Sequence, residues 1–389
     1  MQLVAYGAQD IYLTGNPQIT FFKVVYRRHT NFSMECIEQT MNGSVSASSR
    51  TTTTISRNGD LVSGIHIQIA KGTVIVANSG DNPGHNMLNY VEVEIGGQTI
   101  DKHYGHWMEA HAELTEENPG TVAPQAVNVA PAAGMTKFQG LALAGGVTDT
   151  TTSRTQGEAA FVPLRFWFCR NPGLALPLIA LQYHEVKLIV GWAASLGATS
   201  STISSNVSIW ADYVYLDTDE RRRFAQVSHE YLIEQVQFQD GNASTKSTEL
   251  NFNHPVKELI WAGKAAQIWG AKSDGAGTFS AVAGTNWQIK LNGHDRFAQK
   301  PFSYFTKQQV WKCHTGCGGK AGVANSIAVY SFALKPEEHQ PSGTCNFSRI
   351  DNAELLSSAA ASSHGIYIYA VNYNVLRIMS GMGGLAYSN

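Results

Sequence analysis

Asn171-Pro-Gly-Leu-Ala-Leu-Pro-Leu-Ile-Ala-Leu-Gln-Tyr-His-Glu-Val186 is the most informative stretch of the chain, and it lies between the runs Phe166-Trp-Phe168 and Lys187-Leu-Ile-Val190. Its Pro-Gly pair marks a turn, and Pro177 excludes a central strand around itself because proline cannot donate to a strand ladder. The flanking runs carry aromatic and β-branched residues, which suit a pleated sheet. The pattern predicts strand, turn, apolar connection and strand, with no catalytic group at its centre.

The composition of the whole chain favours an all-β protein. A length of 389 residues exceeds one ordinary core, so two domains of roughly 150 to 200 residues are expected. Charged residues make up 15%, whereas 36 glycines and 10% aromatics favour short strands joined by turns. A net charge of -2 gives no general attraction for a polyanion, so a coat in direct contact with a genome is disfavoured.

Signals for targeting and cross-linking point to synthesis in a reducing compartment. Residues 1–10 lack the basic end and apolar segment of a secretory signal, so synthesis in the cytosol is expected. Charged residues and prolines interrupt the most apolar region, 161–190, so no transmembrane helix is expected. The five cysteines are odd in number and mostly far apart, which favours reduced thiols.

Turn signals divide the first half into an arm and short strands. Residues 1–20 form an arm too short to fold alone, and the run 19–26 predicts the first strand region. A hairpin is predicted next, with strands at 51–56 and 61–69 joined by a primed turn at Arg57-Asn-Gly-Asp60. Further strands are predicted at 90–95, 98–100, 161–168, 185–190 and 207–216. Three long surface loops are predicted at 118–140, 145–157 and 193–205.

A short helix is predicted where the first half ends, at Asp217-Thr-Asp-Glu-Arg-Arg-Arg-Phe224. Asp217 can cap the first amides and Glu220 can return to the cap. Acids precede bases in this octet, which suits the helix dipole. A connector helix is favoured over a nucleic-acid-binding patch.

The same themes recur after the connector. Residues 90–107 and 287–305 share a strand, a glycine turn, a short strand and an aromatic segment. Residues 166–172 are similar to 330–336, and 207–216 are similar to 366–375. This order predicts two copies of one β architecture, each with about eight short strands, the number of a jelly roll.

Several ordered landmarks resemble one family, the major capsid proteins of nucleocytoplasmic large DNA viruses of algae and other protists. The resemblance covers nearly the whole chain, and its landmarks are Asp10-Ile-Tyr-Leu-Thr-Gly15, the stretch 20–32, Arg57-Asn-Gly-Asp-Leu61, Ile100-Asp-Lys-His-Tyr-Gly105, the stretches 171–185 and 217–224, Ser342-Gly-Thr-Cys-Asn-Phe-Ser-Arg-Ile-Asp351 and the stretch 373–387.

The resemblance implies a double jelly roll: two tandem eight-stranded antiparallel jelly rolls in one subunit, with short connecting helices. It divides the chain into an N-terminal arm (1–20), jelly roll 1 (21–216), a connector helix (217–224) and jelly roll 2 (225–389). The implied function is structural: homotrimeric capsomers of pseudo-hexagonal outline that form the icosahedral shell of a large double-stranded DNA virus, assembled in the host cytoplasm. Implied partners are other copies of the chain, minor capsid and penton proteins, inner virion membrane proteins and surface glycans.

Two rival functions fit an aromatic-rich β chain. The first alternative is a carbohydrate-binding jelly-roll protein, because loops on such folds commonly bind sugars. The second is a cupin-like metal enzyme using His103, His106 and Glu109, but residues three apart on one strand point to opposite faces. A connecting segment in which Trp107 packs on the barrel is preferred, so no catalytic residue and no cofactor is expected.

Other candidate sites are also disfavoured. Cys313-His-Thr-Gly-Cys317 offers three zinc ligands where a structural zinc site needs four. The basic residues Lys23, Arg27, Arg28 and His29 are predicted to form structural ion pairs or contacts between subunits rather than to bind phosphate.

Five glycosylation sequons occur in the chain, at Asn31, Asn42, Asn206, Asn242 and Asn346. Surface glycans are implied by the family resemblance and need not follow the sequon. Asn206, beside the Ser/Thr-rich loop, is the first choice of site.

Overall fold

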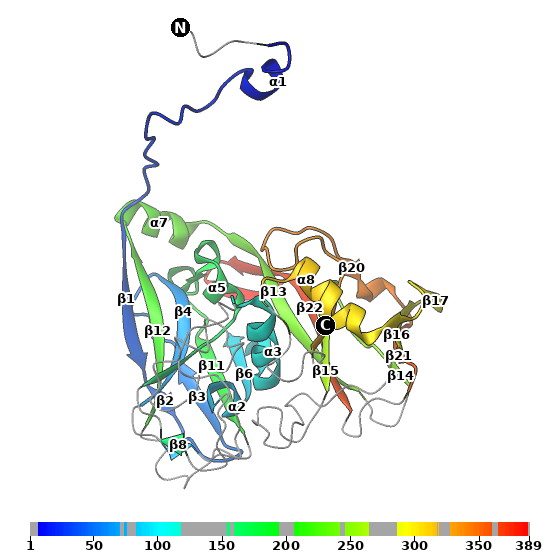
Figure 1. Cartoon of the computed structure of the whole chain (residues 1–389). Coiled ribbons are helices and arrows are strands. Elements are labelled where there is room, and N and C mark those ends of the chain that lie inside the picture. The colour runs from blue at the N-terminus through cyan, green and yellow to red at the C-terminus, as the bar shows by residue number, and fades with distance from the viewer. Residues whose placement is uncertain are drawn as a thin grey trace.

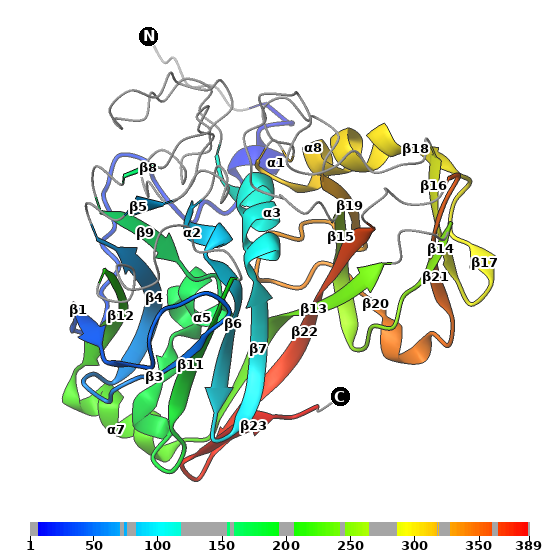
Figure 2. The same cartoon turned by 90° about the horizontal axis from the view of Figure 1, so that it is seen from below.

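Two β-sandwiches lie side by side, and an arm extends from the first of them (Figures 1 and 2). The computed structural model describes residues 7–70, 74–75, 83–117, 154–155, 159–193, 206–241, 246–263, 286–316, 318, 327–359 and 365–387. The arm ends where β1 begins, at the same end of the molecule as helix α7.

The first half holds two facing sheets. Its strands are β1 (Phe32–Gln39), β2 (Met41–Asn42), β3 (Arg50–Thr54), β4 (Leu61–Ile69), β5 (Val74–Ile75), β6 (Leu88–Ile95), β7 (Gln98–Tyr104), β8 (Arg154–Thr155), β9 (Ala160–Pro163), β10 (Leu176–Pro177), β11 (Val186–Trp192) and β12 (Val207–Leu216). Its helices are α1 (Ile11–Thr14), α2 (Pro83–Asn86), α3 (Gly105–Thr115), α5 (Trp167–Arg170), η2 (Pro172–Leu174) and η3 (Leu178–Ala180). The "β1 sheet" has the order β1-β12-β4-β10 with β9 also on β4, and the "β3 sheet" has the order β2-β3-β11-β6-β7.

The second half repeats this arrangement after helix α7 (Thr218–Gln226). Its strands are β13 (His229–Gly241), β14 (Ser247–Glu249), β15 (Pro255–Gly263), β16 (Asn286–Leu291), β17 (His294–Asp295), β18 (Lys300–Pro301), β19 (Ile327–Ser331), β20 (Cys345–Asn346), β21 (Ala353–Ser357), β22 (Ile366–Met379) and β23 (Met382–Leu385). Its other helices are η4 (Tyr304–Gln308), α8 (Gln309–Cys313) and η5 (Phe347–Arg349). The "β13 sheet" has the order β13-β22-β15-β19, with β20 on β15 and β23 on β22, and the "β14 sheet" has the order β14-β21-β16-β17, with β18 on β16.

The two halves have one strand order. β12 and β22 occupy the same place in their sheets, and so do β4 and β15. β10 with η3 corresponds to β20 with η5, because each short strand pairs with the start of the equivalent long strand. The predicted internal repeat and the predicted tandem antiparallel jelly rolls are therefore confirmed, although the sheets are open sandwiches rather than closed barrels.

Three local predictions are wrong. Residues 19–26 form no strand; they are exposed, and the first strand is β1. The predicted hairpin at Arg57-Asn-Gly-Asp60 does not exist, because β3 pairs with β2 and β11 while β4 pairs with β9, β10 and β12 in the opposite sheet. The connection crosses the sandwich instead of reversing within one sheet. The strand predicted at 161–168 ends at Pro163, and α5 follows.

The connector helix is present as α7. Asp217 is its N-cap and accepts a hydrogen bond from the amide of Thr218 at 2.8 Å. The helix is tied to the first half because Arg221 Nε lies 3.0 Å from Asp60 Oδ1. The Asp60 carboxylate also accepts from the amide of Leu216 at 2.8 Å. One buried carboxylate thus joins the end of β12 to the connector.

The two halves share a hydrophobic core, which we call the seam. Along β15, Leu259 and Trp261 point into the second sandwich, whereas Ile260 and Ala262 join the core of the first half. β22 divides its side chains in the same way. Because successive residues of a strand point to opposite faces, the β13 sheet is buried on both faces. The two jelly rolls are therefore packed into one body.

Helix α3 occupies the seam. It begins at Gly105, where a Cβ would lie 2.2 Å from the carbonyl oxygen of Leu88, so only glycine fits. Nine of its eleven residues are buried, including Trp107. A helix buried this completely is held by packing on all sides rather than by an amphipathic face.

Two further predictions concern regions with little or no described structure. The predicted loops 118–140, 145–157 and 193–205 lie almost entirely outside the described residues. The parts of them that are described are β8, which pairs with β5, and Ala193, which follows β11. Among the described helices, none has the length and apolar character needed to cross a bilayer.

Candidate functional site

The histidines of the cupin-like motif point in different directions. His103 lies on β7, with Nε2 2.8 Å from Asp101 Oδ2 and its ring against Trp107. His106 lies on α3, with Nδ1 2.9 Å from the hydroxyl oxygen of Tyr369 in the second half. Complete burial lowers the pKa of His106 to about 3. The two imidazoles do not converge on one metal, and the predicted packing of Trp107 in the first core is confirmed.

His314 serves as an ion-pair partner rather than a zinc ligand. Its Nε2 lies 3.1 Å from Glu258 and its Nδ1 lies 3.1 Å from Glu337. Burial opposes the charge on this ring, but the two carboxylates outweigh burial and raise the pKa of His314 to about 9. Cys317, the other end of the predicted motif, lies outside the described residues. With both nitrogens facing carboxylates, the imidazole is held as a cation.

A buried ion network joins the two halves. Arg170 of α5 lies with Nη1 2.8 Å from Glu234 on β13, and Lys257 of β15 lies with Nζ 2.8 Å from the other oxygen of the same carboxylate. The side chains of Glu234 and Lys257 are 6% and 2% exposed. Such groups are tolerated inside a protein only when they are paired. The network therefore fixes how the first half meets the β13 sheet.

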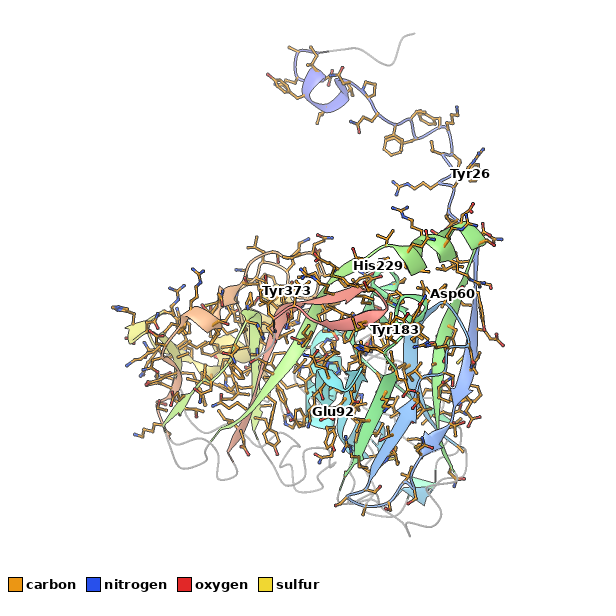
Figure 3. The ribbon with its side chains drawn as sticks, turned by 180° about the vertical axis from the view of Figure 1, so that it is seen from behind. Tyr26, Asp60, Glu92, Tyr183, His229 and Tyr373 are labelled. Atoms are coloured by element: carbon orange, nitrogen blue, oxygen red, sulfur yellow. The ribbon has the colours of Figure 1, made fainter. Side chains whose placement is uncertain are left out.

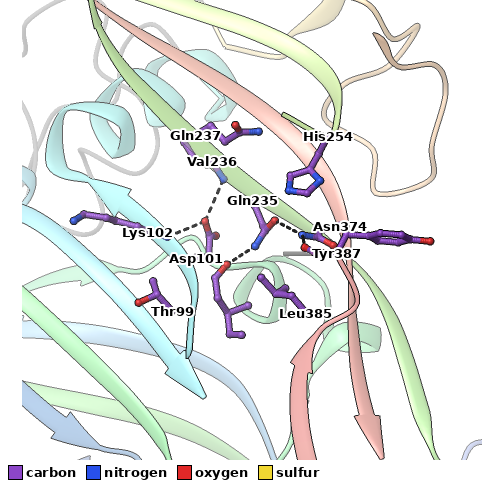
Figure 4. Close-up of a pocket in the computed structure, with 11 residues that line it drawn as sticks. Thr99, Asp101, Lys102, Gln235, Val236, Gln237, His254, Asn374, Leu385 and Tyr387 are labelled. Carbon is purple, nitrogen blue, oxygen red and sulfur yellow. Dashed lines mark hydrogen bonds between the residues drawn. The ribbon is translucent and has the colours of Figure 1, made fainter. Parts of the chain in front are cut away.

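A polar cavity of about 190 Å³ lies where β7 meets β13 and the C-terminal segment (Figure 4). Asp101 Oδ1 accepts from the amide of Val236 at 3.1 Å, and Gln235 donates to the carbonyl of Ile100. Asn374 donates to Gln235 at 2.9 Å and to the carbonyl of Tyr387 at 3.0 Å. These polar groups bind one another across the two halves. The cavity is thus part of the seam and offers no convergent set of catalytic groups.

The end of the 171–186 stretch also belongs to the seam. The amide of Tyr183 donates to the carbonyl of Gly381 at 3.0 Å, and His184 lies 3.0 Å from the carbonyl oxygen of Gly383. Figure 3 shows Tyr183 beside the C-terminal strands. Arg57 donates to the carbonyl of Leu181 at 2.5 Å and so holds the same segment from the other side. The stretch therefore clasps the C-terminal hairpin formed by β22 and β23.

Residues 7–31 comprise the described part of the arm (1–20) and the segment that leads from it to β1; they are exposed almost throughout and stand away from the body. Phe21, Phe22 and Tyr26 are 93%, 99% and 85% exposed, and Figure 3 shows Tyr26 outside the packed sandwiches. The basic residues of this segment are exposed as well: Lys23, Arg27, Arg28 and His29. Within the described ranges, no ion pair joins Lys23, Arg27 or Arg28 to a carboxylate, so the intramolecular form of that prediction is not supported. Exposed aromatic residues that lie close together in this way are typical of an interaction surface.

The sequons lie at different depths. Asn31, Asn42 and Asn346 are exposed, Asn206 is half-buried, and Asn242 lies outside the described residues. The carbonyl of Asn206 accepts from the amide of Ala70 at 2.8 Å, at the start of β12. Asn346 accepts from the amide of Ser348 at 3.1 Å and caps η5. Exposure alone does not distinguish Asn206 from the other sites.

The seam residues were missed by sequence reasoning. Only one local signal points to them: Lys257 and Glu258 interrupt an otherwise apolar strand. Charges inside a strand that is buried on both faces require partners. Those partners, Glu234 and His314, lie far away in the sequence, so their identity could not be read from the strand itself.

Comparison with known proteins agrees with this geometry. A family model described as "Major capsid protein N-terminus" matches residues 20–217, and one described as "Large eukaryotic DNA virus major capsid protein" matches residues 220–384. The chain is 51% identical over 422 residues to the major capsid protein of Pyramimonas orientalis virus, covering 100% of this chain and 99% of that one. It is 43% identical over 461 residues to the major capsid protein of Paramecium bursaria Chlorella virus 1, with the same coverage.

Solved structures show the same fold. The structure of VP54 of PBCV-1 superposes with a TM-score of 0.74 at 39% identity, covering 95% of this chain and 100% of that one. The Faustovirus major capsid protein superposes with a TM-score of 0.67 at 13% identity, covering 96% and 94%, which shows a shared fold. The chain therefore belongs to the major capsid protein family of large eukaryotic DNA viruses, whose members are structural proteins of the virion capsid and not enzymes.

Proposed function

We propose that three copies of this chain form a capsomer of pseudo-hexagonal outline, the tile of an icosahedral shell. The repeated strand order is the observation that carries this proposal. Two similar lobes per chain give six lobes in a closed trimer, and a six-lobed tile packs evenly on a hexagonal lattice. The seam supports it further, because a tile needs its two lobes at a fixed mutual orientation.

Mass measurement and imaging of the purified full-length chain test this proposal. The expected result is a particle of three times the 42.2 kDa chain mass with a six-lobed outline. A stable monomer that binds glycans would instead support the carbohydrate-binding alternative, which the matches to capsid proteins do not favour. A stable monomer that retains metal through His103 and His106 would contradict the structural role altogether.

The proposed division of the chain is an arm (1–20), jelly roll 1 (21–216), a connector helix (217–224) and jelly roll 2 (225–389). The arm is assigned to contacts with neighbouring capsomers, with minor capsid and penton proteins, and with proteins of an inner virion membrane. Its exposed apolar residues, among them Tyr12 and Leu13, support this assignment, because covering apolar side chains that lie in water lowers the free energy.

A double substitution in the exposed segment that directly follows the arm tests the role of this end of the chain. Phe21→Ser with Phe22→Ser should leave the trimer intact, since neither ring contacts the packed body. Attachment of minor capsid proteins in infected cells should fall strongly. Normal virion assembly by this variant would contradict the proposal that this end of the chain binds partners.

Surface glycosylation and the place of assembly complete the proposal. Asn206 remains the proposed glycan site, because it directly follows the Ser/Thr-rich sequence 193–205. Peptide mass spectrometry of virions tests this site. A glycan on Asn206 is expected, and an unmodified Asn206 peptide would show that Asn206 is not the glycan site. Assembly is proposed to occur in the host cytoplasm, and immunogold labelling of infected cells would locate the capsomers.

A further inference from the structure

Three side chains with metal-binding atoms meet on the outer face of the β1 sheet, the face turned away from the first core. Cys36 lies on β1, His66 on β4 and Asp212 on β12, between the other two strands. Their Sγ, imidazole nitrogen and carboxylate oxygen all lie within 4.8 Å of one another. Strand pairing places Cys36 directly opposite Asp212, so these two side chains share one face.

The backbone around Asp212 is irregular at this point. Asp212 pairs with Gly64 and Tyr213 pairs with Val62, so Ser63 is an extra residue on β4 and forms a β-bulge. Bulges commonly redirect a side chain near a functional site. Gly64 provides the necessary room, because a Cβ at that position would lie 2.7 Å from Asp212 Oδ2. The carboxylate therefore rests over a glycine and leans toward the other two donors.

The cluster is open to solvent. Cys36 is exposed, and His66 and Asp212 are half-buried. An ion can therefore reach the three donor atoms from the surrounding water.

We propose that Cys36, His66 and Asp212 bind one zinc ion on the outer face of the first jelly roll. Sulfur, nitrogen and oxygen are the donors that zinc takes in proteins, at about 2.0 to 2.3 Å, so its ligand atoms in a tetrahedral site lie roughly 3.3 to 3.8 Å apart. The three donor atoms of this cluster lie within 4.8 Å of one another, so they must move closer together to hold the ion. Three protein ligands leave one coordination position for water.

Zinc at this place would fix an edge strand. β1 is the edge of its sheet and carries the arm at its start. A metal that joins β1 to both β12 and β4 adds a cross-link within β1 itself, close to the point where the N-terminal segment enters the sheet. The ion would therefore stabilise the base of the arm without contributing any chemistry.

Metal titration of the full-length protein tests the proposal. After treatment with a chelator, the protein should bind one equivalent of zinc per chain. Cobalt in place of zinc should give the thiolate-to-metal charge-transfer band of a cysteine ligand. Cys36→Ser and Asp212→Asn should each weaken zinc binding by at least about 10-fold, the lower end of the effect of losing even an outer-shell partner.

A matched control separates this site from other thiols. Cys345 is a half-buried cysteine of the second jelly roll, and Cys345→Ser should bind zinc like the wild type. Zinc should raise the unfolding temperature of the wild type and of Cys345→Ser, but not that of Cys36→Ser. Equal melting without zinc shows that the variants fold. Absence of stoichiometric zinc in the wild type, or unchanged binding by Cys36→Ser, would overturn the proposal.

Discussion

The β1 sheet and the β13 sheet have the same strand order but bury different faces. In β4 the buried and half-buried residues alternate over most of the strand, whereas every residue of β15 after Pro255 is buried. The β13 sheet contacts the core of its own sandwich on one face and the first half on the other. The outer face of the β1 sheet carries polar side chains such as His66 and Asp212. The same strand order thus serves two positions. The β13 sheet is the inner copy, which packs the two halves together, and the β1 sheet is the outer copy, with one face directed away from the core.

The largest expected effect is a charge placed on the inner copy. Ile260→Glu buries a carboxylate without a partner, because Ile260 is fully buried in the seam. The free energy of unfolding should fall by more than about 4 kcal/mol. Gln68→Glu, at a half-buried outer-face position on the corresponding strand β4, should cost less than about 0.5 kcal/mol. Urea denaturation of both variants measures the difference, and equal losses would show that the two faces are equivalent.

A second pair of substitutions compares two glutamates on β13. Glu234→Gln leaves the buried Lys257 and the half-buried Arg170 without their anion, which should cost about 3 to 5 kcal/mol. Glu230 pairs with Arg377 at the surface, with side chains 59% and 50% exposed, so Glu230→Gln should cost at most about 1 kcal/mol. Chemical denaturation measures both. A mild effect of Glu234→Gln would mean that water reaches the network.

Acid should weaken the seam through His106. Its folded pKa of about 3 lies below the ordinary value of about 6.5, so the folded state resists protonation. Its contribution to stability is complete above pH 6.5 and is lost as the pH falls toward 3. His106→Gln should make the free energy of unfolding less dependent on pH in this window. An unchanged acid profile would assign acid sensitivity to other groups.

Alkali should weaken the seam through His314, with a smaller shift. Its folded pKa of about 9 lies above the ordinary value, so its contribution is complete below pH 6.5 and is lost as the pH rises toward 9. His314→Gln should flatten the stability profile between these values. Thermal unfolding across that range checks this, and a profile that keeps the wild-type slope would contradict the assignment of His314 as a buried cation.

The repeat was readable from the sequence because it depends on local themes. Residues 207–216 and 366–375 are both long β-branched and aromatic runs, and they became equivalent strands β12 and β22. Pairing partners were less accessible. The turn signal at Asn58-Gly59 suggested a hairpin, but tertiary packing sent β3 and β4 to opposite sheets.

A run of apolar residues in the sequence does not show which other part of the protein, if any, packs against that run. Residues 19–26 have the composition of a strand, yet no neighbouring strand is present within the described part of the chain to pair with them. The cluster of Cys36, His66 and Asp212 had no local signal, because strand pairing alone brings together residues from three distant segments. Sites assembled by long-range strand pairing therefore could not be predicted from the sequence. Segments with local turn and strand signals, such as 171–186, could be.

Native-state hydrogen exchange tests most directly whether the seam makes the two jelly rolls one cooperative unit. The amides of β11, in the first half, and of β15, in the second, report on the two cores separately. A shared core predicts that both sets exchange through one global opening, with equal opening free energies and the same dependence on denaturant. Exchange of β15 at lower free energy while β11 stays protected would contradict the account, because the second jelly roll would then open on its own.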